Sequence, residues 1–223
     1  MHEVMCHSVQ QSLADRGIVA VLEIEDEETA VPTARALVDG GITAIELALR
    51  TPAALASIER IAREVPEMMI GAGTVILGGQ AKEVKKLGAA FAVAPGYNPK
   101  IVEEALDCGL SFAPGIATAT ELEAAYAQGC SIMKFFPAAY IGGIEYFKGM
   151  SGPYSYLGIK FFPLGGITEE ALADWAALEQ VVAIGGSWIA KRNLIKAGRY
   201  GEITRQATRA KEIWNQIRGK ALP

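Results

Sequence analysis

The feature that most constrains the fold of this chain is a repeated alternation of short apolar runs with segments of helical pattern. Each run is largely continuous in hydrophobicity, which is typical of parallel strands covered on both faces. Eight such runs occur, at residues 18–22, 44–48, 69–72, 91–94, 110–113, 132–136, 160–164 and 181–184. Eight strands that alternate with helices in 223 residues predict an α/β protein, a (β/α)8 TIM barrel near the small end of that fold's size range.

Helix signals fill the gaps between these runs. They predict helices at residues 29–38, 51–65, 99–108, 120–128 and 200–218, and an extra helix is expected before the first strand. Thr51 precedes Pro52, which indicates an N-cap followed by a proline in the first turn. Thr120 and Glu123 have the spacing of a capping box, so this helix is expected to begin at Thr120.

An open doubly wound sheet is the alternative to the barrel. Such a sheet usually has a glycine fingerprint after its first strand, whereas this chain has Leu-Glu-Ile-Glu at residues 22–25. Its glycine-rich loops follow the seventh and eighth strands instead, which favours the barrel. No linker or shift in composition marks a boundary, so residues 1–223 are interpreted as one domain.

Composition narrows the possible partners. The chain has 25 acidic and 21 basic residues, without the surplus of Lys and Arg that a general nucleic-acid binder needs. No run reaches the roughly 18 apolar residues of a membrane span. Cys6, Cys108 and Cys130 lack a Cys-x-x-Cys spacing and fit reduced thiols. We therefore expect a cytoplasmic protein with a small-molecule partner and neither nucleic acid nor membrane.

Metal chemistry is not indicated by the sequence. The two histidines, His2 and His7, both precede the first predicted strand. No carboxylate cluster has the spacing of a metal site. The sequence therefore predicts neither a metal ion nor another cofactor.

Lys134 is the first candidate for chemistry, because it lies inside the apolar run at residues 132–137. A charged ammonium in such surroundings must be paired, must reach water, or must lose its proton. A neutral amine can attack a carbonyl group as a nucleophile. A lysine at a strand end whose head reaches solvent is the structural alternative, and the local pattern alone leaves both open.

Glu46 is a second charged residue in an apolar strand, and Arg50 follows it four residues later. A structural ion pair between the two is one interpretation. Alternation along a strand also places residues 46, 48 and 50 on one side, so both charges can point into the same opening. A carboxylate there can act as a general base, which typically contributes about 10²- to 10⁴-fold in rate.

Two glycine pairs follow the last predicted strands, Gly165-Gly166 after the seventh and Gly185-Gly186, with Ser187 next, after the eighth. Exposed backbone N–H groups near helix N-termini favour a phosphate dianion, and in a barrel this is the usual place for one. Plain tight turns are the alternative. After the third strand, the glycines within residues 71–74 allow a close approach to the backbone, and Thr74 adds a hydroxyl donor.

Taken together, these motifs resemble the 2-keto-3-deoxy-6-phosphogluconate aldolase family over nearly the whole chain. The resemblance rests on Glu46 with Arg50 and on residues 71–75, 94–96, 113–115, 133–138, 165–167 and 184–188. It implies a metal-independent class I aldolase on a (β/α)8 barrel, a homotrimer of the Entner–Doudoroff pathway. Members of the family often also cleave 4-hydroxy-2-oxoglutarate to pyruvate and glyoxylate.

The resemblance also implies roles for individual residues. Lys134 would form the Schiff base and Glu46 would move protons. The residues expected to bind substrate are Arg50 and Thr74 at the carboxylate of the pyruvate half, Gly165, Gly166, Gly186 and Ser187 at the phosphate, and Pro95 and Phe136.

Three positions depart from the family pattern. Leu164 stands where many members have Thr or Ser, Ala48 where some have Thr, and Glu23 where some have a basic residue. The alternatives are a galactonate-type aldolase that acts on the C4 epimer, a phosphosugar isomerase or epimerase with Glu46 as base, and a non-catalytic phosphate-ligand sensor. Arg50 favours the gluconate type over the galactonate type.

Overall fold

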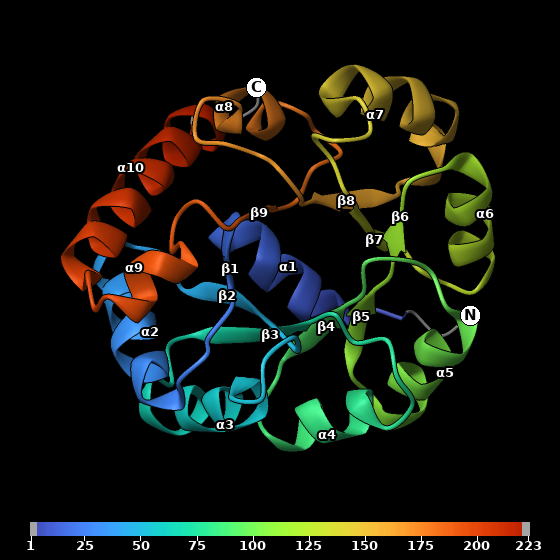
Figure 1. Cartoon of the computed structure of the whole chain (residues 1–223). Helices are drawn as coiled ribbons and strands as arrows, with labels where there is room; N and C mark the ends of the chain where they lie inside the picture. Colours follow the sequence, from blue (N-terminus) through green and yellow to red (C-terminus); the bar gives the residue numbers. More distant parts are fainter. Residues whose placement is uncertain (1–3, 220–223) are drawn as a thin grey trace.

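The computed structural model describes residues 4–219, and within them nine strands form parallel pairs (Figure 1). Seven of the nine follow a predicted apolar run to within one residue, one has no predicted counterpart, and the last begins three residues later than expected. They are β1 (Ile18–Leu22), β2 (Ala44–Ala48), β3 (Met69–Gly73), β4 (Phe91–Val93), β5 (Ser111–Ala113), β6 (Gly115–Ile116), β7 (Ile132–Phe135), β8 (Lys160–Pro163) and β9 (Ile184–Gly186).

The hydrogen bonds join these strands into two sheets. The larger has the order β5-β4-β3-β2-β1-β9 and the smaller the order β6-β7-β8. β1 therefore lies between the second strand and the last one, unlike the 3-2-1-4-5-6 order of a dinucleotide-binding sheet. Figure 1 shows the strands curving around a common centre with most helices on the outside. The protein thus has an α/β fold built on curled parallel sheets.

Ten α-helices and two 3-10 helices accompany the strands in the described part of the chain. They are α1 (His7–Arg16), η1 (Glu27–Thr29), α2 (Ala30–Asp39), α3 (Ala54–Glu64), α4 (Gln80–Lys86), α5 (Pro99–Cys108), α6 (Ala119–Ala127), α7 (Gly143–Ser151), η2 (Gly152–Leu157), α8 (Leu172–Ala176), α9 (Arg192–Lys196) and α10 (Tyr200–Arg218). The predictions at residues 99–108 and 200–218 coincide with α5 and α10. α1 precedes β1 and crosses the middle of the ring in Figure 1.

The apolar core divides into an outer and an inner cluster. The outer cluster lies between strands and helices and includes Ile18 and Leu47. The inner cluster includes Val19, Ala44 and Ile132, together with Leu13 from α1. Successive side chains of a strand point to opposite faces. A residue two positions after Ala44 or Ile132 therefore shares the inner face. Positions 46 on β2 and 134 on β7 therefore face inward.

Several expected boundaries move once tertiary contacts are present. α3 begins at Ala54, because the Thr51 hydroxyl donates to the Ile24 carbonyl oxygen and does not cap the helix. The last strand, expected at residues 181–184, runs from 184 to 186, and Val181 forms only an isolated bridge with Phe161.

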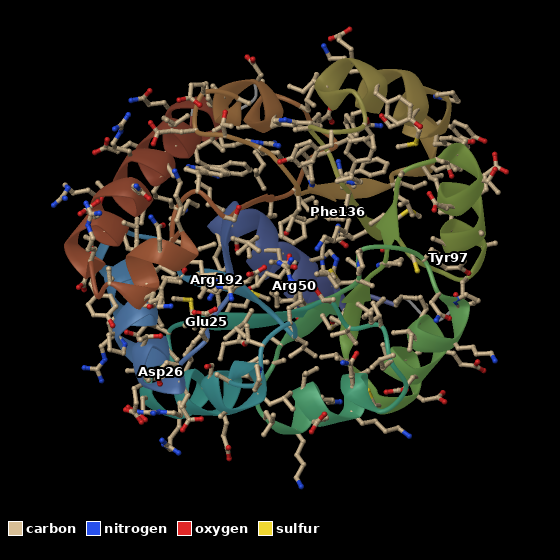
Figure 2. All side chains as sticks on the ribbon, in the orientation of Figure 1. Glu25, Asp26, Arg50, Tyr97, Phe136 and Arg192 are labelled. Carbon is tan, nitrogen blue, oxygen red and sulfur yellow. The ribbon has the colours of Figure 1, made fainter. Side chains whose placement is uncertain are left out.

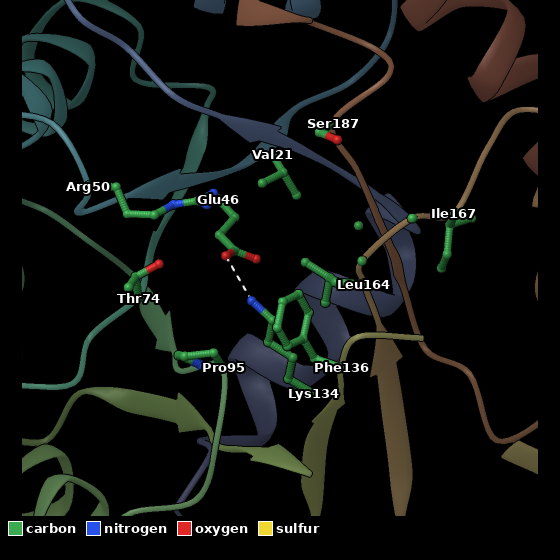
Figure 3. Close-up of a pocket in the computed structure, with 13 residues that line it drawn as sticks. Val21, Glu46, Arg50, Thr74, Pro95, Lys134, Phe136, Leu164, Ile167 and Ser187 are labelled. Atoms are coloured by element: carbon green, nitrogen blue, oxygen red, sulfur yellow. Dashed lines mark hydrogen bonds and ion pairs between the residues drawn. The ribbon is translucent and has the colours of Figure 1, made fainter. Parts of the chain in front are cut away.

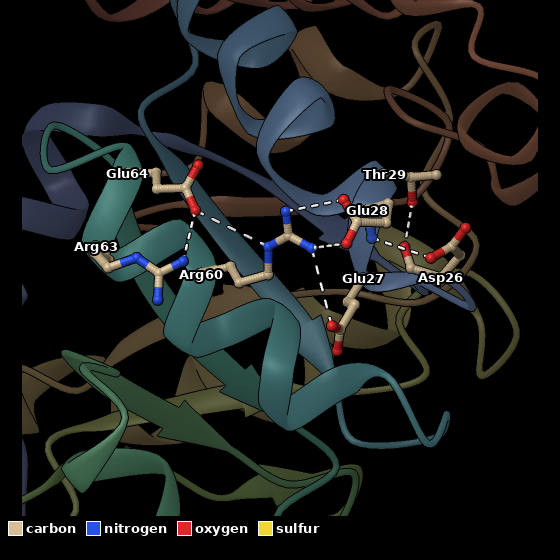
Figure 4. Close-up of polar contacts among 7 residues, drawn as sticks. All are labelled: Asp26, Glu27, Glu28, Thr29, Arg60, Arg63 and Glu64. Atoms are coloured by element: carbon tan, nitrogen blue, oxygen red, sulfur yellow. Dashed lines mark hydrogen bonds and ion pairs between the residues drawn. The ribbon is translucent and has the colours of Figure 1, made fainter.

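An ion network on the outer surface fixes the segment that follows β1 (Figure 4). Arg60 of α3 binds both carboxylate oxygens of Glu28, at 2.5 and 3.1 Å, and this contact lowers the pKa of Glu28. Asp26 accepts a hydrogen bond from the Glu28 backbone N–H at 3.1 Å and so caps η1. The acidic residues after β1 thus bind groups close to them in the fold. These contacts position the chain where it leaves the sheet.

The capping box of α6 involves different residues from those expected. The Thr118 hydroxyl accepts from the Glu121 backbone N–H at 3.3 Å, and the Glu121 carboxylate accepts from the Thr118 backbone N–H at 2.9 Å. Thr120 is the second residue of the helix, within its first turn. The expected pair at 120 and 123 is therefore wrong by two residues. Both pairs match the Thr-x-x-Glu spacing, and the path of the chain from β6 selects the earlier one.

This difference gives a stability test. Thr118→Ala should lower the free energy of unfolding by about 1 kcal/mol, because the helix loses its N-cap acceptor. Thr120→Ala, the matched control, should change it by less than about 0.5 kcal/mol, since Thr120 is exposed within the helix. Urea unfolding of both variants measures the difference. Equal losses in the two variants would contradict the assignment of the cap.

Candidate active site

A cavity of about 300 Å³ opens at the carboxyl ends of the strands (Figure 3). Side chains and loops that follow β2, β3, β4, β7, β8 and β9 meet there. Nine of the ten residues expected from the sequence line it: Glu46, Arg50, Thr74, Pro95, Lys134, Phe136, Gly165, Gly166 and Ser187. The tenth, Gly186, does not.

Lys134 and Glu46 meet inside this cavity. The Lys134 ammonium nitrogen Nζ donates to Glu46 Oε1 at 3.0 Å, and the two side chains are only 6% and 3% exposed. Lys134 does not reach solvent, so the alternative of a strand-end lysine in water is wrong. The pair joins β7 to β2 across the inner face, and the Phe136 ring centroid lies 5.0 Å from Nζ. A buried cation and a buried carboxylate thereby satisfy each other.

Glu46 keeps one oxygen available. Its Oε2 atom is buried and has no hydrogen-bond partner among the described residues. Gly73 makes room for this carboxylate, since a Cβ atom at position 73 would lie 2.3 Å from Glu46 Oε1. Glu46 itself lines the cavity, so this oxygen is the candidate acceptor for a hydrogen bond from a water or a substrate hydroxyl.

Arg50 lies at the mouth of the cavity. Its ion-pair partner is not Glu46, which the sequence suggested. Its Nη2 atom is 2.7 Å from Glu23 Oε1, so the interpretation of a Glu46–Arg50 ion pair is wrong. The side chain of Arg50 is 52% exposed. Figure 2 shows Arg50, Arg192 and Glu25 close to one another near the centre of the ring, whereas Tyr97 lies at its edge.

The glycine loop after β8 presents backbone donors to the cavity. Gly165 and Gly166 have φ angles of 96° and 78°, in the region that glycine adopts without strain. Within residues 4–219, the N–H groups of Gly165, Gly166 and Ile167 donate to no acceptor. Ser187 adds a hydroxyl from the loop after β9. Backbone N–H groups that converge in this way favour an anion.

Gly186 serves a packing role. A Cβ atom there would lie 1.9 Å from the Trp188 ring, so the absence of a side chain makes room for Trp188. Its expected place in the cavity wall is taken by Gly185. Binding of the phosphate by the Gly186 backbone, which the family resemblance implies, stays a prediction.

Sequence reasoning also missed part of the apolar wall. Val21, Ile167 and Gly185 line the cavity, and so does Leu164, which the sequence marked only as a departure. Val21 lies two residues after Val19 of the inner cluster, so strand alternation would have identified it. Leu164 likewise lies two residues after Phe162 of the inner cluster, whereas Ile167 lies in the turn after β8, where strand alternation does not apply.

The described residues contain no group of three His, Cys, Asp or Glu side chains placed to hold a metal ion. His7 is exposed at the start of α1, and His2 lies outside the described residues. Burial raises the pKa of the Cys130 thiol to about 12, so at neutral pH it is not a thiolate nucleophile. Across residues 4–219, none of the helices is long and apolar enough to cross a membrane.

Comparisons with known proteins agree with this geometry. The family model described as KDPG and KHG aldolase matches residues 9–206. The KHG/KDPG aldolase of Escherichia coli K12 is 39% identical over 205 residues, which cover 92% of this chain and 95% of that protein. The 2-dehydro-3-deoxy-phosphogluconate aldolase of Treponema pallidum is 39% identical over 197 residues, 88% of this chain and 93% of that protein.

Solved structures lead to the same group. The KDPG aldolase of Legionella pneumophila has a TM-score of 0.84 at 36% identity, over 89% of this chain and 96% of that one. That structure holds pyruvate captured at low pH as a covalent carbinolamine intermediate. The 2-keto-3-deoxy-6-phosphogluconate aldolase of Zymomonas mobilis ZM4, with 3-phosphoglycerate, has a TM-score of 0.82 at 32% identity, over 92% and 96% of the two chains.

Thr74 has an unusual backbone in this site. Its φ angle is 61°, and among the described residues it alone is a non-glycine residue with positive φ. A β-branched residue in this region is strained by about 1–3 kcal/mol, and such strain clusters at functional sites. Figure 3 shows the Thr74 side chain at the cavity wall.

Replacing Thr74 with glycine should therefore stabilise the fold. Glycine relieves the strain but adds conformational entropy to the unfolded chain, so we expect Thr74→Gly to raise the free energy of unfolding by about 1 kcal/mol. Thr29 has a φ angle of −84°, and the control Thr29→Gly should lower stability by a similar amount. Thermal unfolding would refute the strain argument if both variants lost stability.

Proposed function

The chain belongs to the KDPG and KHG aldolase family and is a lyase, and we propose that Lys134 and Glu46 catalyse its class I aldol cleavage. The proposed reaction converts 2-dehydro-3-deoxy-6-phosphogluconate to pyruvate and glyceraldehyde 3-phosphate. The observation that carries this proposal is the buried pair between Lys134 Nζ and Glu46 Oε1 at 3.0 Å inside the cavity. It provides an amine nucleophile and a proton carrier in contact with each other.

The first half of the reaction uses Lys134. When a proton passes from Lys134 to Glu46, the amine has a free electron pair and attacks the C2 ketone of the substrate. Glu46 returns that proton to the hydroxyl of the resulting carbinolamine, which leaves as water, so a protonated imine forms and Glu46 is again a carboxylate. This imine withdraws electrons from the C3–C4 bond, so the protein needs no other electron acceptor at this step.

Glu46 then moves the proton that bond cleavage requires. Its carboxylate takes the C4 hydroxyl proton, directly or through a water, as the C3–C4 bond breaks and glyceraldehyde 3-phosphate leaves. The electron pair of that bond remains on the three-carbon fragment as an enamine. Glu46 returns a proton to C3, and hydrolysis of the imine releases pyruvate and regenerates Lys134. The unpaired Oε2 atom supports this double use.

The remaining residues of the cavity bind the two ends of the substrate. Arg50 and Thr74 hold the carboxylate of the pyruvate half. Gly165, Gly166 and Ser187 bind the phosphate, with the adjacent Ile167 N–H as a further donor. Pro95 and Phe136 form the walls beside Lys134. Gly186 supports this site by admitting Trp188 behind the loop.

The finer architecture is part of the same proposal. We interpret the two sheets as one (β/α)8 barrel in a single domain, with α1 as an added helix. Pro114 alone separates β5 of one sheet from β6 of the other, and Val181, just before β9, pairs with Phe161 of β8. From the family resemblance we propose a homotrimer in the cytoplasm, a place in the Entner–Doudoroff pathway, and a second activity on 4-hydroxy-2-oxoglutarate.

Trapping with borohydride tests the central step. Incubation with pyruvate and borohydride should add one reduced pyruvyl group at Lys134, because the reagent fixes the imine as a stable amine. Lys134→Met should remove both the adduct and the cleavage activity. Peptide mass mapping locates the adduct, and a coupled assay measures pyruvate release.

Two results would overturn the proposal. One is an unmodified wild-type protein. The other is a folded Lys134→Met variant that keeps its activity, as a phosphosugar isomerase or epimerase using Glu46 as base would. Because this variant leaves Glu46 buried without its cation, its thermal midpoint is measured alongside. Pyruvate release from the gluconate- and galactonate-derived phosphates, compared side by side, assigns the C4 stereochemistry.

Leu164 gives a test of the phosphate assignment. Its side chain is buried and packs where a Cβ atom on Gly185 would lie, 2.3 Å away, next to the proposed phosphate loop. Leu164→Thr adds a hydroxyl donor there and should lower the KM for the phosphorylated substrate about threefold to tenfold, the effect of one ordinary hydrogen bond. The KM for unphosphorylated 4-hydroxy-2-oxoglutarate is the control and should stay within twofold. Equal changes for both substrates would argue against a phosphate at this loop.

A further inference from the structure

A chain of alternating charges crosses the mouth of the cavity. Arg50 contacts Glu23 at 2.7 Å, and the other oxygen of Glu23 lies 3.4 Å from Nη1 of Arg192. Arg192 also binds Glu25, which in turn lies 3.8 Å from Lys196. Glu23 is therefore held between two guanidinium groups, one on each side. Figure 2 shows Arg50, Arg192 and Glu25 in this region.

Glu23 lies at a second cavity that adjoins the first. This second cavity has a volume of about 340 Å³ and shares Val21, Arg50 and Ser187 with the cavity around Lys134. Glu23 follows β1 directly and lines the second cavity but not the first. Its carboxylate therefore reaches Arg50 from the side away from Lys134, and it does not occupy the space where the substrate would bond to Lys134.

The contact leaves most of Arg50 available. Within the described residues, Glu23 is the only side chain paired with the Arg50 guanidinium, and the contact is made through Nη2. A guanidinium has five N–H donors in a planar fork, so one edge can bind a carboxylate while Nη2 stays on Glu23. A half-exposed arginine without such a partner would sample many rotamers, and fixing it on binding would cost side-chain entropy.

We propose that Glu23 is a positioning residue that fixes the guanidinium of Arg50 at the cavity mouth, oriented to receive the carboxylate of the keto acid. This inference rests on the proposed function, in which Arg50 binds the carboxylate of the pyruvate half. Arg192 acts behind it, because Arg192 holds the second oxygen of Glu23. In this arrangement Glu23 touches neither the substrate nor the reacting atoms.

Removing the Glu23 carboxylate could also have the opposite effect and tighten substrate binding, which is the alternative outcome of the test below. Glu23 is an anion near a site for an anionic substrate, so its charge opposes binding through space. The two effects predict changes of opposite sign when the carboxylate is removed. Positioning predicts weaker binding in the variant, and charge repulsion predicts tighter binding. The sign of the change therefore decides between them.

The experiment measures the pyruvate concentration that gives half-maximal borohydride trapping on Lys134, together with KM and kcat for cleavage. Glu23→Ala should raise the half-saturating pyruvate concentration and KM about tenfold, with kcat within twofold and full trapping at saturation. Glu25→Ala is the matched control, since Glu25 contacts Arg192 and Lys196 but neither Arg50 nor either of the two cavities. It should stay within twofold of the wild type.

A double-mutant cycle shows whether Glu23 acts through Arg50. In the background of Arg50→Ala, the added change Glu23→Ala should have no further effect on half-saturation. An unchanged or lowered half-saturating concentration in Glu23→Ala, a full tenfold effect that persists without Arg50, or an equal effect in Glu25→Ala would each overturn the inference. These results differ from failure of the proposed function, in which the wild type itself would not be trapped.

Discussion

The contact on which the rest of this structure depends is the one between Lys134 and Glu46. Each side chain alone would be a charge buried among apolar strands, at a cost of several kcal/mol, and each removes most of that cost from the other. The two residues are 88 positions apart, so the contact forms only when β2 and β7 face each other across the inner surface. The fold thus brings together two reactive groups that no local structure could pair.

The same arrangement divides the cavity into regions of different chemistry. Around the Lys134 nitrogen the walls are the Phe136 ring and other apolar groups, which limit the access of water. Beside them lie the unpaired N–H groups after β8, and at the mouth lies the cation of Arg50. A molecule with a carbonyl between two anionic ends matches this order of nucleophile, cation and backbone donors, which is why one long anionic keto acid fits better than a neutral sugar.

The inner-face pattern was predictable from the sequence, because it follows from strand alternation. Glu46 and Lys134 stand out as charges in apolar runs, and both lie where that pattern places them. The partner of Arg50 was not predictable, because Glu23 meets it only after β1 and β2 pair with Leu22 opposite Leu47. Similarly, Thr118 and Thr120 satisfy the same capping rule locally, and only the path of the chain into α6 distinguishes them. The bounds of β9 were not predictable locally either, since they depend on its pairing with β1.

The segment at residues 71–74 shows how local strain and site chemistry are linked. Gly73 is required by space, since any side chain there would collide with the Glu46 carboxylate. The next residue turns into the left-handed region, where a second glycine would be the easier choice, yet the chain has Thr74. A strained backbone persists only if the surrounding structure enforces it, and here β3 ends at Gly73 while the Val75 backbone N–H donates to the Val93 carbonyl oxygen at 3.2 Å. The turn therefore holds a hydroxyl at the cavity wall at a cost in stability, which indicates that the hydroxyl itself, and not the fold, accounts for threonine at this position.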